Sequence, residues 1–251
     1  MIRPEYLQAL RQQTVKQGAL AGNPVTFGTD AIDGRIEGGL AQRALHEVFA
    51  ASVEDGSAAA AFAVMIAMRA CPANRPIIWV RENRCDRQIG HVHAAGLAEL
   101  GVDPNDLVLV DAPDMLAVLR AGADIVKCGQ VGAVVIEPWG KAPLLDLTAS
   151  RRLSMAAAVS GVLTLVLRVN AEPMPSAAQT RWQVAAAPSF PLAANAPGHP
   201  AFNIALLRHR GGIAGFETCL EWNRDTRSFA PLSGGVPAVS VLGADRQKKA
   251  A

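Results

Sequence analysis

The stretch ALHEVFAASVEDGSAAAAFAVMIAMR, residues 44–69, decides the predicted fold. Its pattern predicts an apolar strand over 44–49, a polar loop over 50–55 and a helix of small and apolar residues from Gly56 onward. A strand, a loop with a late glycine and a helix form the frame of a phosphate-binding loop, whose helix N-terminus holds phosphate oxygens. The same frame also fits any buried strand–helix unit of an α/β protein.

The residues that would give this loop its chemistry are missing. A working loop ends in G-K-[ST], with the lysine on the β/γ-phosphates and the hydroxyl on magnesium, whereas Gly56 is followed by Ser57 and Ala58. Glu54 and Asp55 add negative charge beside the place of a triphosphate, and each carboxylate there costs about 1 to 4 kcal/mol. We therefore expect no nucleotide cofactor. The degenerate loop consists of Ala50, Glu54, Asp55, Gly56, Ser57 and Ala58.

The bulk properties narrow the class of protein. The chain has 251 residues, half of them hydrophobic, and a net charge of +2, too small to indicate nucleic-acid binding by itself. Four scattered cysteines without C-x-x-C pairing favour neither a metal site nor a disulfide framework. The N-terminus lacks the apolar core of a signal peptide, and the longest apolar run, 58–68, is too short to cross a bilayer. We expect a cytoplasmic protein with no membrane contact.

Alternating apolar runs predict the fold class. After the first unit, the pattern predicts strands over 77–80, 107–110, 133–137 and 162–167 and helices over 88–100, 115–128 and 146–161. Three further strands are expected over 182–186, 203–210 and 216–222. This order predicts an α/β core with a largely parallel sheet extended by antiparallel strands. The predicted units are a helical arm over 1–24, a core over 25–232 and a flexible tail over 233–251.

The segment before the first strand carries a family resemblance. FGTDAIDGRIEGGL, residues 27–40, resembles the lead-in of RecA-type recombinases, with matches at Gly28, Ile32, Asp33, Gly38, Gly39, Leu40 and, in the strand, Glu47. Together with the missing lysine, the phrases TRWQVAAAPS (180–189) and LLRHRGG (206–212) look like the ImuA family, RecA-like and sometimes SulA-like proteins of bacterial SOS mutagenesis cassettes. The resemblance implies a RecA-like P-loop NTPase core in which Glu82 and Glu137 are vestiges of the catalytic and Walker B acids.

The resemblance also implies a function. It implies a non-catalytic adaptor in the DNA damage response, which supports translesion synthesis and induced mutagenesis. Its implied partners are an ImuB-like Y-family polymerase subunit, RecA and an error-prone replicative-type polymerase. Two alternatives stay open: a residual ATPase or DNA-binding protein, against which the missing lysine and hydroxyl argue, and a SulA-like inhibitor of cell division. Direct DNA binding is disfavoured because the segment 169–178 carries Glu172 and, beside it, no cation but Arg168.

The sequence contains no catalytic motif of the other enzyme classes considered. We therefore look for residues that could bind partner proteins. No G-x-S-x-G, H-E-x-x-H or Rossmann glycine pattern occurs, so we expect no enzyme. The segment RENRCDR, 81–87, reads as a charged loop that is either solvated or binds an anion or an acidic partner, and its arginines favour a lowered pKa for Cys85. We expect the two chain ends to recruit partners. The candidate partner-binding residues are Tyr6, Leu7, Leu10, Arg81, Arg84, Arg151 and Arg152.

Overall fold

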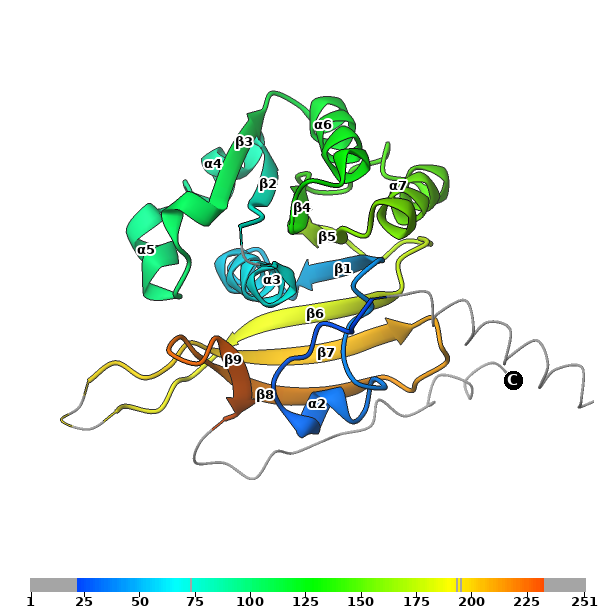
Figure 1. The fold of residues 1–251 in the computed structure, drawn as a ribbon. Helices are drawn as coiled ribbons and strands as arrows, with labels where there is room; N and C mark the ends of the chain where they lie inside the picture. The colour runs from blue at the N-terminus through cyan, green and yellow to red at the C-terminus, as the bar shows by residue number, and fades with distance from the viewer. Residues whose placement is uncertain (1–21, 73, 193, 195, 233–251) are drawn as a thin grey trace, which may run out of the picture.

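The computed structural model describes residues 22–72, 74–192, 194 and 196–232, and one sheet runs through this part of the chain (Figure 1). Its nine strands have the order β3-β2-β4-β5-β1-β6-β7-β8-β9. The strands are β1 (Leu45–Ala50), β2 (Ile77–Glu82), β3 (Leu107–Ala112), β4 (Ala133–Glu137), β5 (Leu163–Arg168), β6 (Thr180–Ala187), β7 (Ala201–His209), β8 (Phe216–Asn223) and β9 (Ser228–Pro231). The helices are α2 (Asp30–Asp33), α3 (Gly56–Ala70), α4 (Asn83–Ile89), α5 (Ala94–Glu99), the short 3-10 helix η1 (Pro104–Asp106), α6 (Met115–Cys128) and α7 (Leu147–Ser160).

The strands from β3 to β6 are parallel, and helices cover both of their faces (Figure 1). Alternation along β4 shows how the faces are divided: Val135 belongs to the core beneath α3, while Val134 and Ile136 belong to the core beneath α6 and α7. A parallel strand that is buried on both faces has to be apolar at nearly every position. This explains why the central strands appear in the sequence as continuous apolar runs.

The strands from β6 to β9 are antiparallel and enclose an aromatic core. Phe27, from the lead-in segment, lies in this core with its ring 5.5 Å from Trp182 and 5.6 Å from Phe229. Phe62 of α3 completes the cluster, with its ring centroid 5.3 Å from Phe229. The lead-in is therefore anchored to the antiparallel end of the sheet as well as to the helix after the degenerate loop.

The lead-in residues that carry the family resemblance hold the backbone in place. The Asp33 carboxylate accepts hydrogen bonds from the N–H groups of Phe27, Gly28 and Thr29 at 2.7, 2.9 and 3.2 Å. Gly39 has a φ of +133°, and a Cβ at this position would lie 2.5 Å from the Val25 carbonyl oxygen. Only glycine fits such a backbone position without strain. The structure gives both residues a folding role.

The predicted fold class is confirmed: the sheet is α/β, mostly parallel and extended by antiparallel strands. The helix over 115–128 and the strand over 133–137 have the predicted bounds. The helix over 88–100 is wrong, because Gly90, at a φ of +86°, separates α4 from α5. The charged loop over 81–87 is also wrong, since its first two residues end β2 and the rest form α4. The short strand β9 was not predicted, and the arm residues 1–21 and the tail 233–251 lie outside the described residues.

Candidate functional site

The carboxyl ends of β2 and β4 form the candidate site, and the strand connections explain why. These two strands are adjacent, but the chain leaves β2 toward β3, at the edge of the sheet, and leaves β4 toward β5, in the opposite direction. Diverging connections leave a crevice outside the carboxyl ends of the strands, which is where open α/β sheets bind ligands. The residues at this crevice are therefore set by the strand order.

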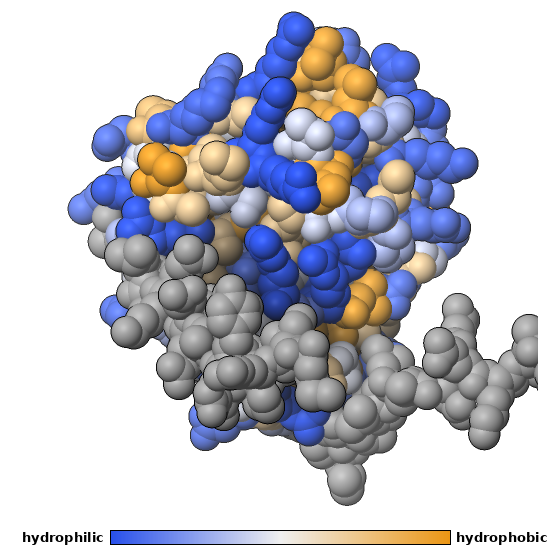
Figure 2. All heavy atoms as spheres, turned by 90° about the vertical axis from the view of Figure 1, so that its right-hand side faces the viewer, coloured by the Kyte–Doolittle hydropathy of each residue, from blue (hydrophilic) through white to orange (hydrophobic). Residues whose placement is uncertain are grey.

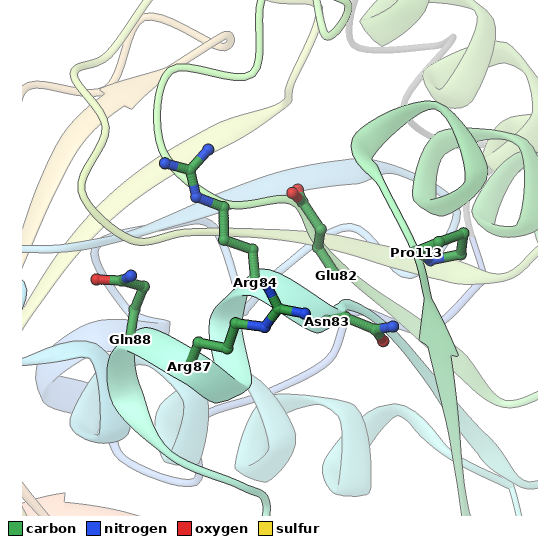
Figure 3. A pocket seen from close by; sticks show the side chains of 6 residues that line it. All are labelled: Glu82, Asn83, Arg84, Arg87, Gln88 and Pro113. Carbon is green, nitrogen blue, oxygen red and sulfur yellow. The ribbon is translucent and has the colours of Figure 1, made fainter.

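Two adjoining hollows open beside the end of β2: one of about 390 Å³ at this crevice, toward the segment after β4, and one of about 400 Å³ toward the segment after β3. Both are lined by Glu82 and Arg84, so we treat them as one and call it the β2–β4 cleft. Figure 3 shows the first hollow, in which the carboxylate of Glu82 and the guanidinium of Arg84 extend toward the same side. The first hollow is also lined by Asn83, Arg87, Gln88 and Pro113, and the second by Met115, Trp139, Gly140, Lys141, Ala142, Pro143 and Asn170.

Glu82 forms the floor of the cleft. Its side chain is only 9% exposed, and one carboxylate oxygen accepts the backbone N–H of Trp139 at 3.0 Å. This bond joins the end of β2 to the segment that follows β4. The sequence resemblance implies a vestigial catalytic acid here, and the structure places the carboxylate at the floor of the cleft in contact with backbone.

Arg84, Arg87 and Lys141 are exposed cations on this cleft. None of the ion pairs formed among the described residues includes them. Since no carboxylate of the described residues forms an ion pair with them, the rim of the cleft is positive above an acidic floor. Such a rim attracts anions and desolvates little on binding.

Arg81 does not belong to this exposed group, which corrects its prediction as a surface residue. Its side chain is 3% exposed, and its Nε donates to Glu137 Oε2 at 2.8 Å. A second nitrogen pairs with Asp86 and also donates to the Gly90 carbonyl oxygen at 2.9 Å. Trp79 Nε1 donates to the same Glu137 oxygen at 2.9 Å. Arg81 thus holds β2, β4 and α4 together beneath the cleft.

Glu137 is fully buried, and its second carboxylate oxygen has no hydrogen-bond partner among the described residues. Burial raises the pKa of Glu137 to about 7, although Arg81 and Trp79 favour the charged form. Burial also raises the pKa of the Cys85 thiol, which packs beside this carboxylate. The expected lowering of the Cys85 pKa is therefore wrong, because burial and the Glu137 carboxylate outweigh the opposite effect of Arg81.

The degenerate loop contrasts with the cleft because apolar side chains pack against it. A Cβ added to Gly56 would lie 3.2 Å from Val169 Cγ1 and 3.3 Å from Ile89 Cδ1. Asp55 is used within the fold: its carboxylate accepts from the Ala186 N–H at 2.8 Å and from Ser52 Oγ at 2.9 Å. Neither hollow of the β2–β4 cleft is lined by loop residues 50–58.

Glu54, Ser57 and Ala58 complete the description of this loop. Glu54 is exposed, and a hydrogen bond from its own backbone N–H lowers the pKa of its carboxyl. Ser57 is exposed and Ala58 half-buried at the start of α3. Ala50 is buried at the end of β1. The start of α3 therefore offers an ionised carboxylate and no cation from these positions.

A second buried polar cluster lies in β1 and β6. The Glu47 carboxylate accepts from Arg181 Nε at 2.8 Å and from Ser176 Oγ at 2.8 Å. His46 Nε2 lies 2.9 Å from the Ala41 carbonyl oxygen, and its Nδ1 lies 2.7 Å from Thr180 Oγ1. The carbonyl oxygen can only accept, so the proton belongs on Nε2. Burial lowers the pKa of His46 to about 4, which keeps the ring neutral.

Arg151 and Arg152, which the sequence also suggested, do not line the cleft. Arg151 and Arg152 are exposed on α7, on which Met155 and Val159 are 69% and 82% exposed. Figure 2 shows the side of the molecule where α6 and α7 lie, with apolar and hydrophilic residues interspersed. Tyr6, Leu7 and Leu10 lie outside the described residues.

The segment 169–178, at the place of a DNA-binding loop in recombinases, has its neighbouring cation, Arg168, buried inside the protein. Arg168 is 3% exposed, and one of its guanidinium nitrogens donates to the carbonyl oxygens of Gly140 and Lys141 at 3.0 Å each. Its cation therefore ties the end of β5 to the segment after β4. Glu172 is exposed on the same segment.

Comparisons and searches add three observations. No model of a known protein family matches this chain, and neither does any curated protein. Among the described residues, no group of three or more histidine, cysteine or acidic side chains is arranged to hold a metal ion. No helix in that part of the chain has the length and apolar character needed to cross a membrane.

Proposed function

We propose that this chain is a RecA-like adaptor of the ImuA type, which works in the DNA damage response without using nucleotide. In this proposal it supports translesion synthesis by holding an ImuB-like Y-family polymerase subunit near an error-prone replicative-type polymerase, with RecA as a further partner. The proposal rests on the family resemblance of the lead-in and of the segments 180–189 and 206–212.

The observation that favours an adaptor over an ATPase is the start of α3. Ser57 and Ala58 stand where a phosphate-binding lysine and a magnesium-binding hydroxyl are needed. Val169 and Ile89 pack against Gly56, and Asp55 is bonded to the backbone of β6. A loop that is built into the packing in this way has a structural role, which leaves protein contacts as the means of action.

Calorimetric titration with Mg-ATP tests the nucleotide part of the proposal. We expect no binding heat for the natural chain at nucleotide concentrations up to about 1 mM, equivalent to less than about 4 kcal/mol of binding free energy. The double substitution Ser57→Lys and Ala58→Thr restores the two missing groups. We expect this variant to show no Mg-ATP binding heat either, because Val169 and Ile89 still pack on the loop.

Capture assays test the partner part. A tagged chain is expected to retain a purified ImuB-like subunit, and the tubulin-like ring protein of cell division serves as the competing bait. Retention of the ring protein alone would replace the adaptor by a division inhibitor. Saturable Mg-ATP binding by the natural chain, at a dissociation constant of about 10 μM or below, would reinstate the ATPase alternative.

A further inference from the structure

The cations of the β2–β4 cleft stabilise no part of the described chain through an ion pair. Arg81, three residues before Arg84, forms ion pairs with Glu137 and Asp86. Arg84, Arg87 and Lys141 form no ion pair with any described residue. The three come from two segments, the start of α4 and the loop after β4, that the strand order brings together. Arg84 lines both hollows, Arg87 the first and Lys141 the second, and three such cations around adjoining hollows indicate an anionic ligand.

The second hollow is lined partly by apolar residues, among them Met115, Ala142 and Pro143, and exposed leucines adjoin two of these residues in the sequence. Leu116 follows the lining residue Met115 and is 42% exposed, and Leu144 follows the lining residue Pro143 and is 49% exposed. An anionic ligand with apolar side chains would gain from both kinds of surface, since burying apolar area adds to ion pairing.

The same features argue against nucleic acid as the ligand. Single strands are held by a continuous basic groove with exposed aromatic rings on which bases stack. Trp139, the aromatic residue that lines the cleft, is 9% exposed, and Arg168 is buried. Glu82 and the exposed Glu172 add negative charge to the neighbourhood. Three cations without a stacking platform suit a short carboxylate-bearing segment better than a phosphate backbone.

We propose that the β2–β4 cleft is a docking site for an acidic segment of a partner protein, whose carboxylates pair with Arg84, Arg87 and Lys141 and whose apolar side chains contact Leu116 and Leu144. This inference rests on the proposed adaptor function in that it names the surface by which one partner is held. Glu82 sets the depth of binding: its carboxylate forms the floor, so the ligand's carboxylates lie at the rim, beside the guanidinium of Arg84 (Figure 3).

The direct test uses a defined probe. A fluorescein-labelled peptide of alternating aspartates and leucines is titrated with the full chain at physiological salt, and an oligothymidylate of equal net charge is titrated in parallel. We expect saturable binding of the peptide and weaker binding of the oligothymidylate. The reversal Arg84→Glu with Lys141→Glu should weaken peptide binding by at least about tenfold, because it turns two attractive charges into repulsive ones.

Two further variants separate a specific site from general attraction. Arg151→Glu with Arg152→Glu makes the same change in net charge on α7, and we expect it to alter peptide affinity by less than about twofold, since neither arginine lines the cleft and exposed charges are screened at this salt. Glu82→Gln keeps an oxygen for the Trp139 N–H but removes the floor charge. We expect it to tighten peptide binding severalfold, an effect opposite in sign to damage of the fold.

The outcomes decide the proposal. Equal weakening by the two charge-reversed pairs, no peptide binding by the natural chain, or tighter binding of the oligothymidylate would each overturn the acidic-peptide site. Failure of this site is distinguishable from failure of the adaptor function. If the ImuB-like subunit is captured equally by the natural chain and by the Arg84→Glu, Lys141→Glu variant, the adaptor stands and this surface is wrong. If the natural chain captures no such subunit, the adaptor is wrong.

Discussion

The start of α3 and the start of α4 lie at the same edge of the sheet, yet they are completed in opposite ways. At α3, Val169 and Ile89 pack against Gly56, and Asp55 is fixed to β6. At α4, the chain leaves two adjoining hollows of about 400 and 390 Å³, and the cations at their rim form no ion pair among the described residues. A loop with the outline of a phosphate site is thus closed, while its neighbour, which has no such outline, stays open.

The comparison teaches that a motif's frame and its chemistry are separable. The strand, loop and helix over 44–70 persist because their apolar residues fill the core on both sides of α3 and β1. Packing requires the frame but not a lysine or a hydroxyl at its end. A ligand-binding site at this end of the sheet is therefore expected where the strand connections diverge, which here is between β2 and β4.

The largest effect is expected beneath the cleft. Glu137→Lys places a cation against Arg81 in a fully buried site, and we expect a loss of at least about 3 to 5 kcal/mol of unfolding free energy. Chemical denaturation monitored by circular dichroism measures it. The double variant Arg81→Met with Glu137→Met removes both charges together and is expected to recover most of that loss. If the double variant is as unstable as Glu137→Lys, the charges are not the cause.

The pH dependence of stability compares the cluster beneath the cleft with the one in β1. The pKa of His46 is lowered by burial to about 4, so its contribution is complete above pH 6.5 and is lost as the pH falls toward 4. The pKa of Glu137 is raised by burial to about 7 from 4.5, so its contribution is complete below pH 4.5 and is lost as the pH rises toward 7. Each amounts to about 3 kcal/mol at full extent.

These opposite signs give a paired measurement. The destabilisation caused by His46→Asn, relative to the natural chain, should shrink as the pH falls from 6.5 to 4. The destabilisation caused by Glu137→Gln should shrink as the pH rises from 4.5 to 7. Denaturant titrations at a series of pH values supply both curves. Two curves with the same slope would mean that one of the two groups is not buried in the form described.

The sequence was sufficient for the parallel core because strands such as β4 are apolar at nearly every position, and helices such as α6 have clear ends. Asp114 caps α6 through the Ala117 N–H at 2.9 Å, and Gly129 ends it at a φ of +68°. Local signals of this kind are visible in one sequence. The four-residue β9 ends in a proline and, among the described strands, pairs with β8 alone, so its sequence carried too little signal.

The site was less predictable because its geometry is non-local. Arg81 looked like the first residue of a charged loop, but the register of β2 on β4 places it opposite Glu137, 56 residues away in the sequence. The cleft requires Lys141 to lie near Arg84, which depends on β4 being the neighbour of β2. Spacing along the chain carries no information on either juxtaposition. One hint was present: RE directly follows the apolar run of β2, as a continuation of the strand would.

The smallest effect is expected at the rim, where Arg81 and Arg84 provide a matched pair three residues apart. Arg84→Ala should change the unfolding free energy by no more than about 0.5 kcal/mol, because the side chain is exposed and forms no ion pair among the described residues. Arg81→Ala leaves Glu137 buried and unpaired, so we expect a loss of about 3 to 5 kcal/mol. Thermal and denaturant unfolding of the two variants measure the difference. A large loss for Arg84→Ala would give this arginine a structural duty and remove it from the set of cations free to hold a ligand.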